Sequence, residues 1–336
     1  MQLPVVPFAD ADFSVPLSAW AILGGVVIVM LAIDLVVFGR GKREVTLKES
    51  IAWSVVWLVL AVAFGGVMWL WQGGAAGSEY LAGYLLERSL SLDNIFVFAV
   101  LFAYFAVPLA VQPRVLAWGI ALALVLRLIF ILVGAALLSS FHFTFYVFGA
   151  LLLYTAWKLI RHDSTEIEPE HNPALKLLRK RLPMTTEYHG RKMTVREGGR
   201  RLATPLVAVF VVVATTDVIF AVDSNPAIFA VTQVPFIVFA ANAFAMLGLR
   251  ALYFVLVGMM DRFVYLSHGL AVILAFIGVK MLIIDLWHVP IWLSLSVIVG
   301  VLVVTAVLSM RVAPAGGAGG TPSEAERERQ RETTSV

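Results

Sequence analysis

The chain has 336 residues, of which 60% are hydrophobic and 14% are charged, and its formal net charge is +3. Soluble domains carry about 25% charged residues, so this composition excludes a soluble globular protein and indicates an integral protein of the lipid bilayer. The chain has no cysteine. Disulfides and thiolate metal sites are therefore excluded, and any metal site must use oxygen or imidazole ligands.

Apolar runs long enough to cross a bilayer recur along the chain and predict about nine transmembrane helices. The expected spans are residues 17–39, 51–71, 79–107, 114–138, 141–161, 203–231, 233–259, 262–287 and 290–311. The first span lacks a basic flank before it, so we interpret it as a retained helix rather than a cleaved signal peptide. The predicted organisation is spans 1–5 in residues 1–161, a basic cytoplasmic loop in 162–202, spans 6–9 in 203–311, and a disordered cytoplasmic tail in 312–336.

The basic residues between these spans alternate from one side of the membrane to the other. They fall in the tail and in the loops after spans 1, 3, 5 and 7, and none falls in the N-terminus or in the loops after spans 2, 4, 6 and 8. Because cytoplasmic loops are rich in lysine and arginine, this pattern predicts a multi-pass inner (plasma) membrane protein with its N-terminus outside and its C-terminus in the cytoplasm. The lysine and arginine residues of the expected cytoplasmic loops therefore explain the net positive charge of the chain. We expect no nucleic-acid partner. Within the basic loop, the sequence of residues 176–181 predicts the beginning of a short helix.

Spans 3–5 resemble spans 6–8, which indicates an internal repeat. Each set opens with an acidic motif, its second helix carries a Leu-Arg pair, and its third helix has a glycine near the start and a lysine near the end. The matching landmarks are Arg127 and Arg250, then Gly149 with Lys158 and Gly269 with Lys280. Because three helices is an odd number, the copies would insert in opposite orientations, as in secondary transporters. We therefore expect an all-α membrane protein with two inverted three-helix repeats.

The two acidic motifs place carboxylates inside apolar spans. Glu87 and Asp93 stand six residues apart, as do Asp217 and Asp223. Ionisable groups at membrane depth are costly and mark ion or proton paths. Residues six apart diverge by about 120° on a regular helix, so they cannot grip one ion together without local unwinding. We expect that unwinding at Asn225-Pro226, because proline cannot continue the helical hydrogen bonds.

These motifs predict one carboxylate-lined metal site where the two repeats meet. The predicted ligands are Glu87, Asp93, Asn94, Asp217, Asp223, Ser224 and Asn225, with Asp93 and Asp223 at the centre. An all-oxygen site with two or more carboxylates suits Mg²⁺, Ca²⁺ or Mn²⁺ and does not suit Cu⁺. The six histidines are scattered, so we expect them in loops or at the interface rather than as ligands.

Four further charged residues are candidate accessory groups: Asp34, Arg127, Arg250 and Lys280. The two arginines would neutralise acidic residues of the site, or form purely structural ion pairs. Asp34 either joins the site or is an interfacial carboxylate near Arg40. Lys280 would pair with Asp285.

Residues 87–94 (ERSLSLDN) and 216–227 (TDVIFAVDSNPA) together resemble the TerC/Alx family of integral membrane proteins, and the resemblance runs from the first span to the last. Members of that family are associated with manganese export and with tellurite-resistance loci, are grouped with LysE-type exporters, and in some cases supply metal to secreted proteins. The resemblance implies Mn²⁺ as the transported substrate and metal-site roles for Glu87, Asp93, Asn94, Asp217 and Asp223. Where the family usually has an apolar residue, this chain has Asn225, whose amide would add a ligand.

The leading hypothesis is therefore a divalent cation exporter, with Mn²⁺ as cargo and protons as the counter-ion. One alternative is a membrane scaffold that delivers metal to secreted metalloenzymes, recruits the secretion machinery through its basic loop, or is associated with tellurium resistance. A remote alternative is an intramembrane aspartyl protease, which the absence of a Gly-x-Gly-Asp sequence disfavours. We expect no enzymatic activity, and a passive channel stays open because sequence does not distinguish passive from coupled flow.

Overall fold

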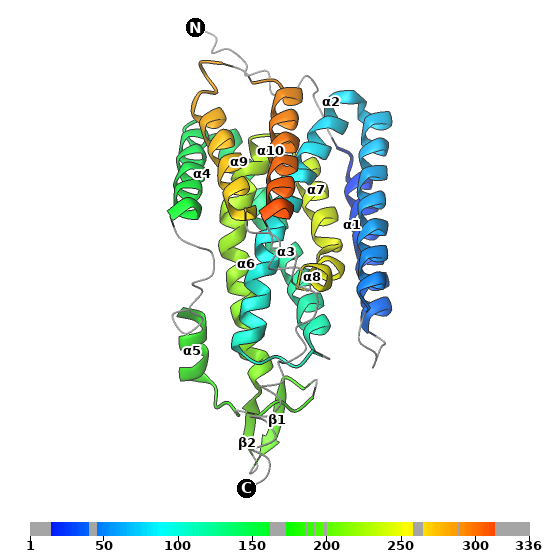
Figure 1. Cartoon of the computed structure of the whole chain (residues 1–336), viewed down its shortest axis with the longest axis vertical. Coiled ribbons are helices and arrows are strands. Elements are labelled where there is room, and N and C mark those ends of the chain that lie inside the picture. Colours follow the sequence, from blue (N-terminus) through cyan, green and yellow to red (C-terminus); the bar gives the residue numbers. More distant parts are fainter. Residues whose placement is uncertain are drawn as a thin grey trace.

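The computed structural model describes residues 15–39, 46–109, 111–161, 173–185, 187–190, 192–197, 200–257, 265–287 and 289–312. The protein is a bundle of long helices with a small hairpin beyond one end (Figure 1). Its helices are α1 (Leu17–Gly39), α2 (Leu47–Tyr104), α3 (Gln112–Ser140), α4 (Thr144–Arg161), α5 (Pro173–Arg181), α6 (Pro205–Phe229), α7 (Pro235–Leu247), α8 (Leu249–Val257), α9 (Leu266–Leu282) and α10 (Ile291–Val312). Its strands are β1 (Thr194–Glu197) and β2 (Arg200–Ala203).

Among the described residues, five helices are long and apolar enough to cross a membrane: α1, α2, α3, α6 and α10. A sixth span is added if α7 and α8, which bend by 44° at their junction, count as one. The structure therefore shows a helical multi-pass membrane protein, while the expected count of nine spans and the inverted repeats stay predictions.

Helix α2 is too long to be a single span. Its 58 residues would measure about 87 Å if straight, against the ~30 Å hydrocarbon core of a bilayer. Gly73 interrupts it with a positive φ of 89°, a conformation that glycine adopts without strain. The chain reverses there, so α2 forms two limbs joined at one end of the bundle (Figure 1). These limbs cover the second and third expected spans.

Helix α7 lies at the centre of the bundle. Twelve of its residues are buried, from Phe236 to Leu247. A helix that is apolar on every side is typical of a buried position, and α7 contacts α1, α2 and α3. The outer helices instead expose large apolar side chains, such as Leu70 of α2. Such surfaces are expected where lipid rather than water surrounds the protein.

Glycines allow α4 and α9 to pack closely. A Cβ atom added at Gly149 would lie 2.9 Å from the Gly278 carbonyl oxygen, and one added at Gly278 would lie 2.9 Å from that of Gly149. Leu282 covers Gly149 while Leu153 covers Gly278, so the contact is reciprocal and the helices run antiparallel. Small residues permit such close approach between membrane helices. Gly269, the expected counterpart of Gly149, packs instead against Thr305 of α10.

The expected unwinding of the chain at Asn225-Pro226 is wrong. The helix continues through Pro226 and ends at Phe229. Proline removes the hydrogen bond to the Val222 carbonyl, but only one helical turn follows it, and the buried side chains of Ile228 and Phe229 hold that turn in place. Positions 217 and 223 therefore lie on different faces of a continuous helix.

The basic loop contains more regular structure than expected. Helix α5 covers the predicted helix and begins three residues earlier, at Pro173. Strands β1 and β2 form an antiparallel hairpin, so the protein is not entirely α-helical. The Tyr188 hydroxyl donates to the Phe105 carbonyl at 2.6 Å, which ties this loop to the end of α2. Residues 162–172 and the predicted disordered tail from residue 313 lie outside the described residues.

Candidate functional site

A buried arginine connects the two acidic motifs. Arg127 lies in the middle of α3 with a fully buried side chain, and it forms an ion pair with Glu87 of α2. Its Nη2 atom also lies 3.7 Å from Oδ1 of Asp217 in α6. Glu87 is fully buried and the Asp217 side chain is 5% exposed. The structure therefore brings one carboxylate of each motif to the same guanidinium group, as expected for an arginine that neutralises them.

Neutral polar side chains complete this Arg127 cluster. The Nη1 atom of Arg127 donates to Asn242 Oδ1 at 3.0 Å and to Ser224 Oγ at 3.2 Å. Asn242 Nδ2 donates to Glu87 Oε2 at 3.5 Å, and Ser91 Oγ donates to Glu87 Oε1 at 3.3 Å. Neither Asn242 nor Ser91 was predicted from the sequence. The sequence does carry a signal for Asn242, because it is the one polar residue in the otherwise apolar sequence of α7.

Several polar atoms in and next to the cluster are buried without a hydrogen-bond partner among the described residues. They are Asp217 Oδ2, the Nε and Nη2 atoms of Arg127, and both amide atoms of Asn225. Buried polar atoms are nearly always partnered, so each exception requires an explanation such as a functional role or a bound ion or water. Asp217 also lines a small cavity of about 10 Å³, enough for roughly one water-sized species. The cavity lies between α2, α3, α6 and the junction of α7 with α8.

The remaining predicted ligands are only partly described. Asn94 is buried in α2. Asp93 and Asp223 have helical backbone, but their side chains lie outside the described part of the structure. Among the side chains that are described, no group of three or more histidines or carboxylates is close enough to hold a metal ion. The assignment of Asp93 and Asp223 as central ligands therefore stays a prediction.

A second buried ion pair joins α1 to α8. Arg250 Nη2 lies 2.8 Å from Asp34 Oδ2 and also donates to the Asp34 carbonyl oxygen. Arg250 Nη1 donates to the Pro113 carbonyl at 3.4 Å, at the start of α3. Asp34 is 3% exposed, so its carboxylate is buried within the protein. These two candidate accessory residues thus neutralise each other.

The expected pairing of Lys280 with Asp285 is wrong. Lys280 Nζ donates to Ser294 Oγ at 3.0 Å. Asp285 lies 3.4 Å from His142 Nε2 and accepts a hydrogen bond from Tyr146. Because both Asp285 and His142 are about half exposed, this pair ties together two loops at the surface rather than neutralising a charge inside the bundle.

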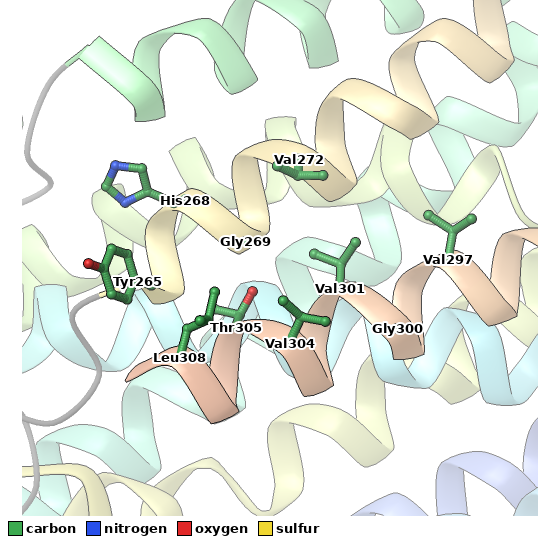
Figure 2. A pocket seen from close by; sticks show the side chains of 10 residues that line it. All are labelled: Tyr265, His268, Gly269, Val272, Val297, Gly300, Val301, Val304, Thr305 and Leu308. Carbon is green, nitrogen blue, oxygen red and sulfur yellow. The ribbon is translucent and has the colours of Figure 1, made fainter. Parts of the chain in front are cut away.

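A mainly apolar groove lies between α9 and α10. It has a volume of about 530 Å³, with Tyr265 and His268 at one end (Figure 2). Valines, two glycines, Thr305 and Leu308 form the rest of its lining. A hard divalent cation requires several oxygen ligands, preferably carboxylates, so this groove does not suit one.

Long apolar helices, lipid-facing apolar surfaces and buried ion pairs define a polytopic integral membrane protein. The sequence profile described as "Integral membrane protein TerC family" matches residues 72–315. The chain belongs to this family, which confirms the family expected from the two acidic motifs.

Relatives of known sequence extend over most of the chain. Alx of Escherichia coli (strain K12), whose name proposes a role as a membrane-bound redox modulator, is 46% identical over 299 residues, which cover 86% of this chain and 93% of Alx. The uncharacterized membrane protein STKORF319 of Myxococcus xanthus is 45% identical over 302 residues, which cover 89% and 95% of the two chains. An uncharacterized membrane protein of Mycobacterium bovis is 41% identical over 258 residues, or 76% of this chain and 65% of that protein. No solved structure matches.

Proposed function

We propose that the protein exports divalent cations from the cytoplasm across the inner membrane, with Mn²⁺ as the leading substrate and protons as the counter-ion. The observation that carries this proposal is the Arg127 cluster, where carboxylates from α2 and α6 meet inside the bundle. Buried ionisable groups in a membrane protein mark ion paths. Carboxylate, amide and hydroxyl oxygens are the ligands that Mg²⁺, Ca²⁺ and Mn²⁺ prefer.

Arg127 and a divalent cation would compete for the same carboxylates. Two positive charges repel each other strongly where the dielectric constant is low. A cation that binds Glu87 and Asp217 together therefore requires the guanidinium group to move away, and its return would release the cation. Protonation of the same carboxylates would also weaken cation binding. The unsatisfied Asp217 Oδ2 supports Asp217 as one of the ligands of the cation.

The proposed architecture has nine spans with two inverted repeats, an outer N-terminus and a cytoplasmic C-terminus. In support of this proposal, the two limbs of α2, the pair α7–α8 and the helices α1, α3, α4, α6, α9 and α10 each overlap one of the nine expected spans in residue range. The reciprocal contact of Gly149 with Gly278 supports the repeats, because it has the symmetry of a two-fold axis in the membrane plane. It also suggests that Gly278, rather than Gly269, is the counterpart of Gly149.

Transport by purified protein in proteoliposomes tests the proposal. We expect Mn²⁺ flux that increases when a pH gradient is imposed. Glu87→Gln and Asp217→Asn should each reduce it by about tenfold or more, since a lost charged ligand costs roughly 1.5–3 kcal/mol. Asp285→Asn is the matched control, because this carboxylate is exposed at the surface.

Two outcomes would contradict different parts of the proposal. Wild-type rates in both Glu87→Gln and Asp217→Asn would show that the site is assigned wrongly. Absence of Mn²⁺ flux in the wild-type protein, with and without the gradient, would rule out Mn²⁺ transport itself.

A second candidate function is a membrane scaffold that supplies metal to secreted metalloenzymes, and the name of Alx adds redox modulation to it. Because the chain has no cysteine, a redox effect could not use its own thiols and would act through metal supply. Helix α5 and the β1–β2 hairpin would provide the cytoplasmic contact surface. Deletion of residues 173–197 separates the roles: a scaffold loses its effect on secreted metalloenzymes, while Mn²⁺ flux persists.

A further inference from the structure

A second polar cluster involves a carboxylate that belongs to neither acidic motif. Glu79 of α2 accepts a hydrogen bond of 2.6 Å from the Thr232 hydroxyl, which follows the end of α6. Glu79 also interacts electrostatically with Lys280 of α9. Lys280 is 7% exposed, and it donates to Ser294 of α10 at 3.0 Å. The Glu79 carboxylate thus joins α2 to the segment after α6, the Lys280 ammonium group joins α9 to α10, and the two charges act on each other.

This outer cluster lies at the end of the bundle where α2 reverses. Glu79 follows the turn at Gly73 by six residues, Lys280 is in the last turn of α9, and Ser294 is in the first turn of α10. The turn of α2 and these ends of α9 and α10 lie at the end of the molecule opposite the β1–β2 hairpin (Figure 1). In the proposed orientation they face the outer compartment. Glu79 precedes Glu87 by eight residues, or about 12 Å along the same helix.

The charges of the outer cluster indicate whether a divalent cation or a proton would bind there. It holds one carboxylate, one ammonium group and two hydroxyls, so its formal charge is zero. A divalent cation prefers several carboxylate oxygens, and the Lys280 ammonium group would repel it. A single proton needs only one carboxylate oxygen, and the Thr232 hydroxyl remains in contact with either form of Glu79. Protonation of Glu79 removes its attraction for Lys280, so proton binding weakens an electrostatic attraction between α2 and α9.

We propose that Glu79 is the outer proton-binding site of the exchange and that Lys280 is its counter-charge. The inference rests on the proposed export function and deepens it by naming the residue that receives the counter-ion. A proton from the outer compartment forms an O–H bond with a Glu79 carboxylate oxygen, and Lys280 keeps its own protons and its hydrogen bond to Ser294. Of the described groups, Lys280 is the charged side chain that acts on Glu79. Asp285 and His142, at the same end, pair with each other.

Glu79→Gln tests this assignment, because glutamine keeps an acceptor for Thr232 but binds no proton in this pH range. Two rates are measured in proteoliposomes: exchange of labelled Mn²⁺ at equal pH, and Mn²⁺ accumulation driven by a pH gradient. We expect accumulation to fall by about tenfold or more while exchange stays within about twofold of wild type. Asp285→Asn, at the same end of the bundle, should change neither rate.

Other outcomes overturn the assignment. Full accumulation by Glu79→Gln means that the proton binds elsewhere, and loss of exchange as well as accumulation places Glu79 in the cation path. If wild-type protein shows neither exchange nor accumulation, the failure belongs to the proposed export function and not to Glu79.

Lys280→Gln provides an independent variant that retains hydrogen bonding to Ser294. Removal of the positive charge makes a proton on Glu79 more favourable by Coulomb's law. The external pH at half-maximal accumulation should therefore move upward, and an unchanged pH profile would overturn the role of Lys280 as counter-charge.

Discussion

At the scale of single residues, the charged interior of this protein depends on Arg127. The Nη1 atom of Arg127 donates to Glu87, Ser224 and Asn242, while its Nη2 atom lies 3.7 Å from Asp217, so the two ends of one planar guanidinium group face both carboxylates. Lysine, with a compact ammonium group, cannot reproduce this geometry. Arg127 is therefore the counter-charge of both carboxylates and, in the proposed function, the group that a transported cation would displace.

Arg127→Leu should destabilise the protein by about 3–5 kcal/mol near neutral pH, because two buried carboxylates lose their counter-charge. The loss should shrink as the pH falls, since protonated carboxylates need no counter-charge. Thermal unfolding in detergent across a range of pH measures this effect. Arg311→Leu, at the exposed end of α10, is the matched control. A destabilisation that is equal at all pH values would contradict the ion-pair explanation.

The residues of the site show where sequence reasoning succeeds. Glu87, Asp217 and Arg127 could be identified because charge inside an apolar span is rare and costly. Their contacts with one another could not be identified in this way, because Arg127 is 40 residues from Glu87 and 115 residues from Asn242 along the sequence. Glu79 was not predicted because it is the first residue of an expected span, where a carboxylate carries no such signal.

At the scale of helices, close packing at glycines determines which elements meet. Helix α4 contacts α9 through Gly149 and Gly278, and α3 contacts α6 where a Cβ at Gly134 would lie 2.8 Å from the Phe229 ring. Helices in lipid gain little hydrophobic free energy from packing together, because lipid tails are as apolar as the side chains. Van der Waals contacts at such close approaches therefore supply much of the association energy.

Gly278→Val should therefore force α4 and α9 apart and cost about 1–3 kcal/mol, the usual range for overpacking. The apparent melting temperature in detergent reports this loss. Gly66→Ala in α2 is the control, because a Cβ there meets no atom within 4 Å. An equal melting temperature for Gly278→Val and the wild type would mean that the close helix contact contributes nothing to stability.

Helix boundaries illustrate how tertiary contacts override local preferences. The apolar runs predicted the positions of the long helices, because membrane thickness sets their length. Pro226 was expected to unwind α6, yet buried packing of the following turn keeps it helical. The β1–β2 hairpin was not predicted, since two four-residue strands in a basic loop have no distinctive apolar pattern.

At the scale of the whole molecule, the distribution of basic residues predicts the orientation in the membrane. The chain has no cysteine, so single cysteines can be introduced without a background of native thiols. Ser140, at the end of α3, and Thr194, in β1, are both exposed and lie at opposite ends in the proposed topology.

We expect an impermeant thiol reagent to label Ser140→Cys in cells whose cytoplasmic membrane is intact, and to label Thr194→Cys only after that membrane is permeabilised. The positive-inside rule is the physical reason, because Lys and Arg resist translocation. The reverse labelling pattern would contradict the outer N-terminus and, with it, the outer location of Glu79.

Local patterns in the sequence identify a helical membrane protein of the TerC family with carboxylates inside its expected spans. Composition, span length and charge distribution carry this information, and each can be evaluated from short stretches of the chain. Which charges lie near one another depends instead on helix packing: Glu87 and Asp217 lie at Arg127, Asp34 pairs with Arg250, and the charge of Lys280 acts on Glu79. The physical reason is that a buried charge is stabilised by whichever opposite charge the packing of helices brings near it, whatever its distance along the chain.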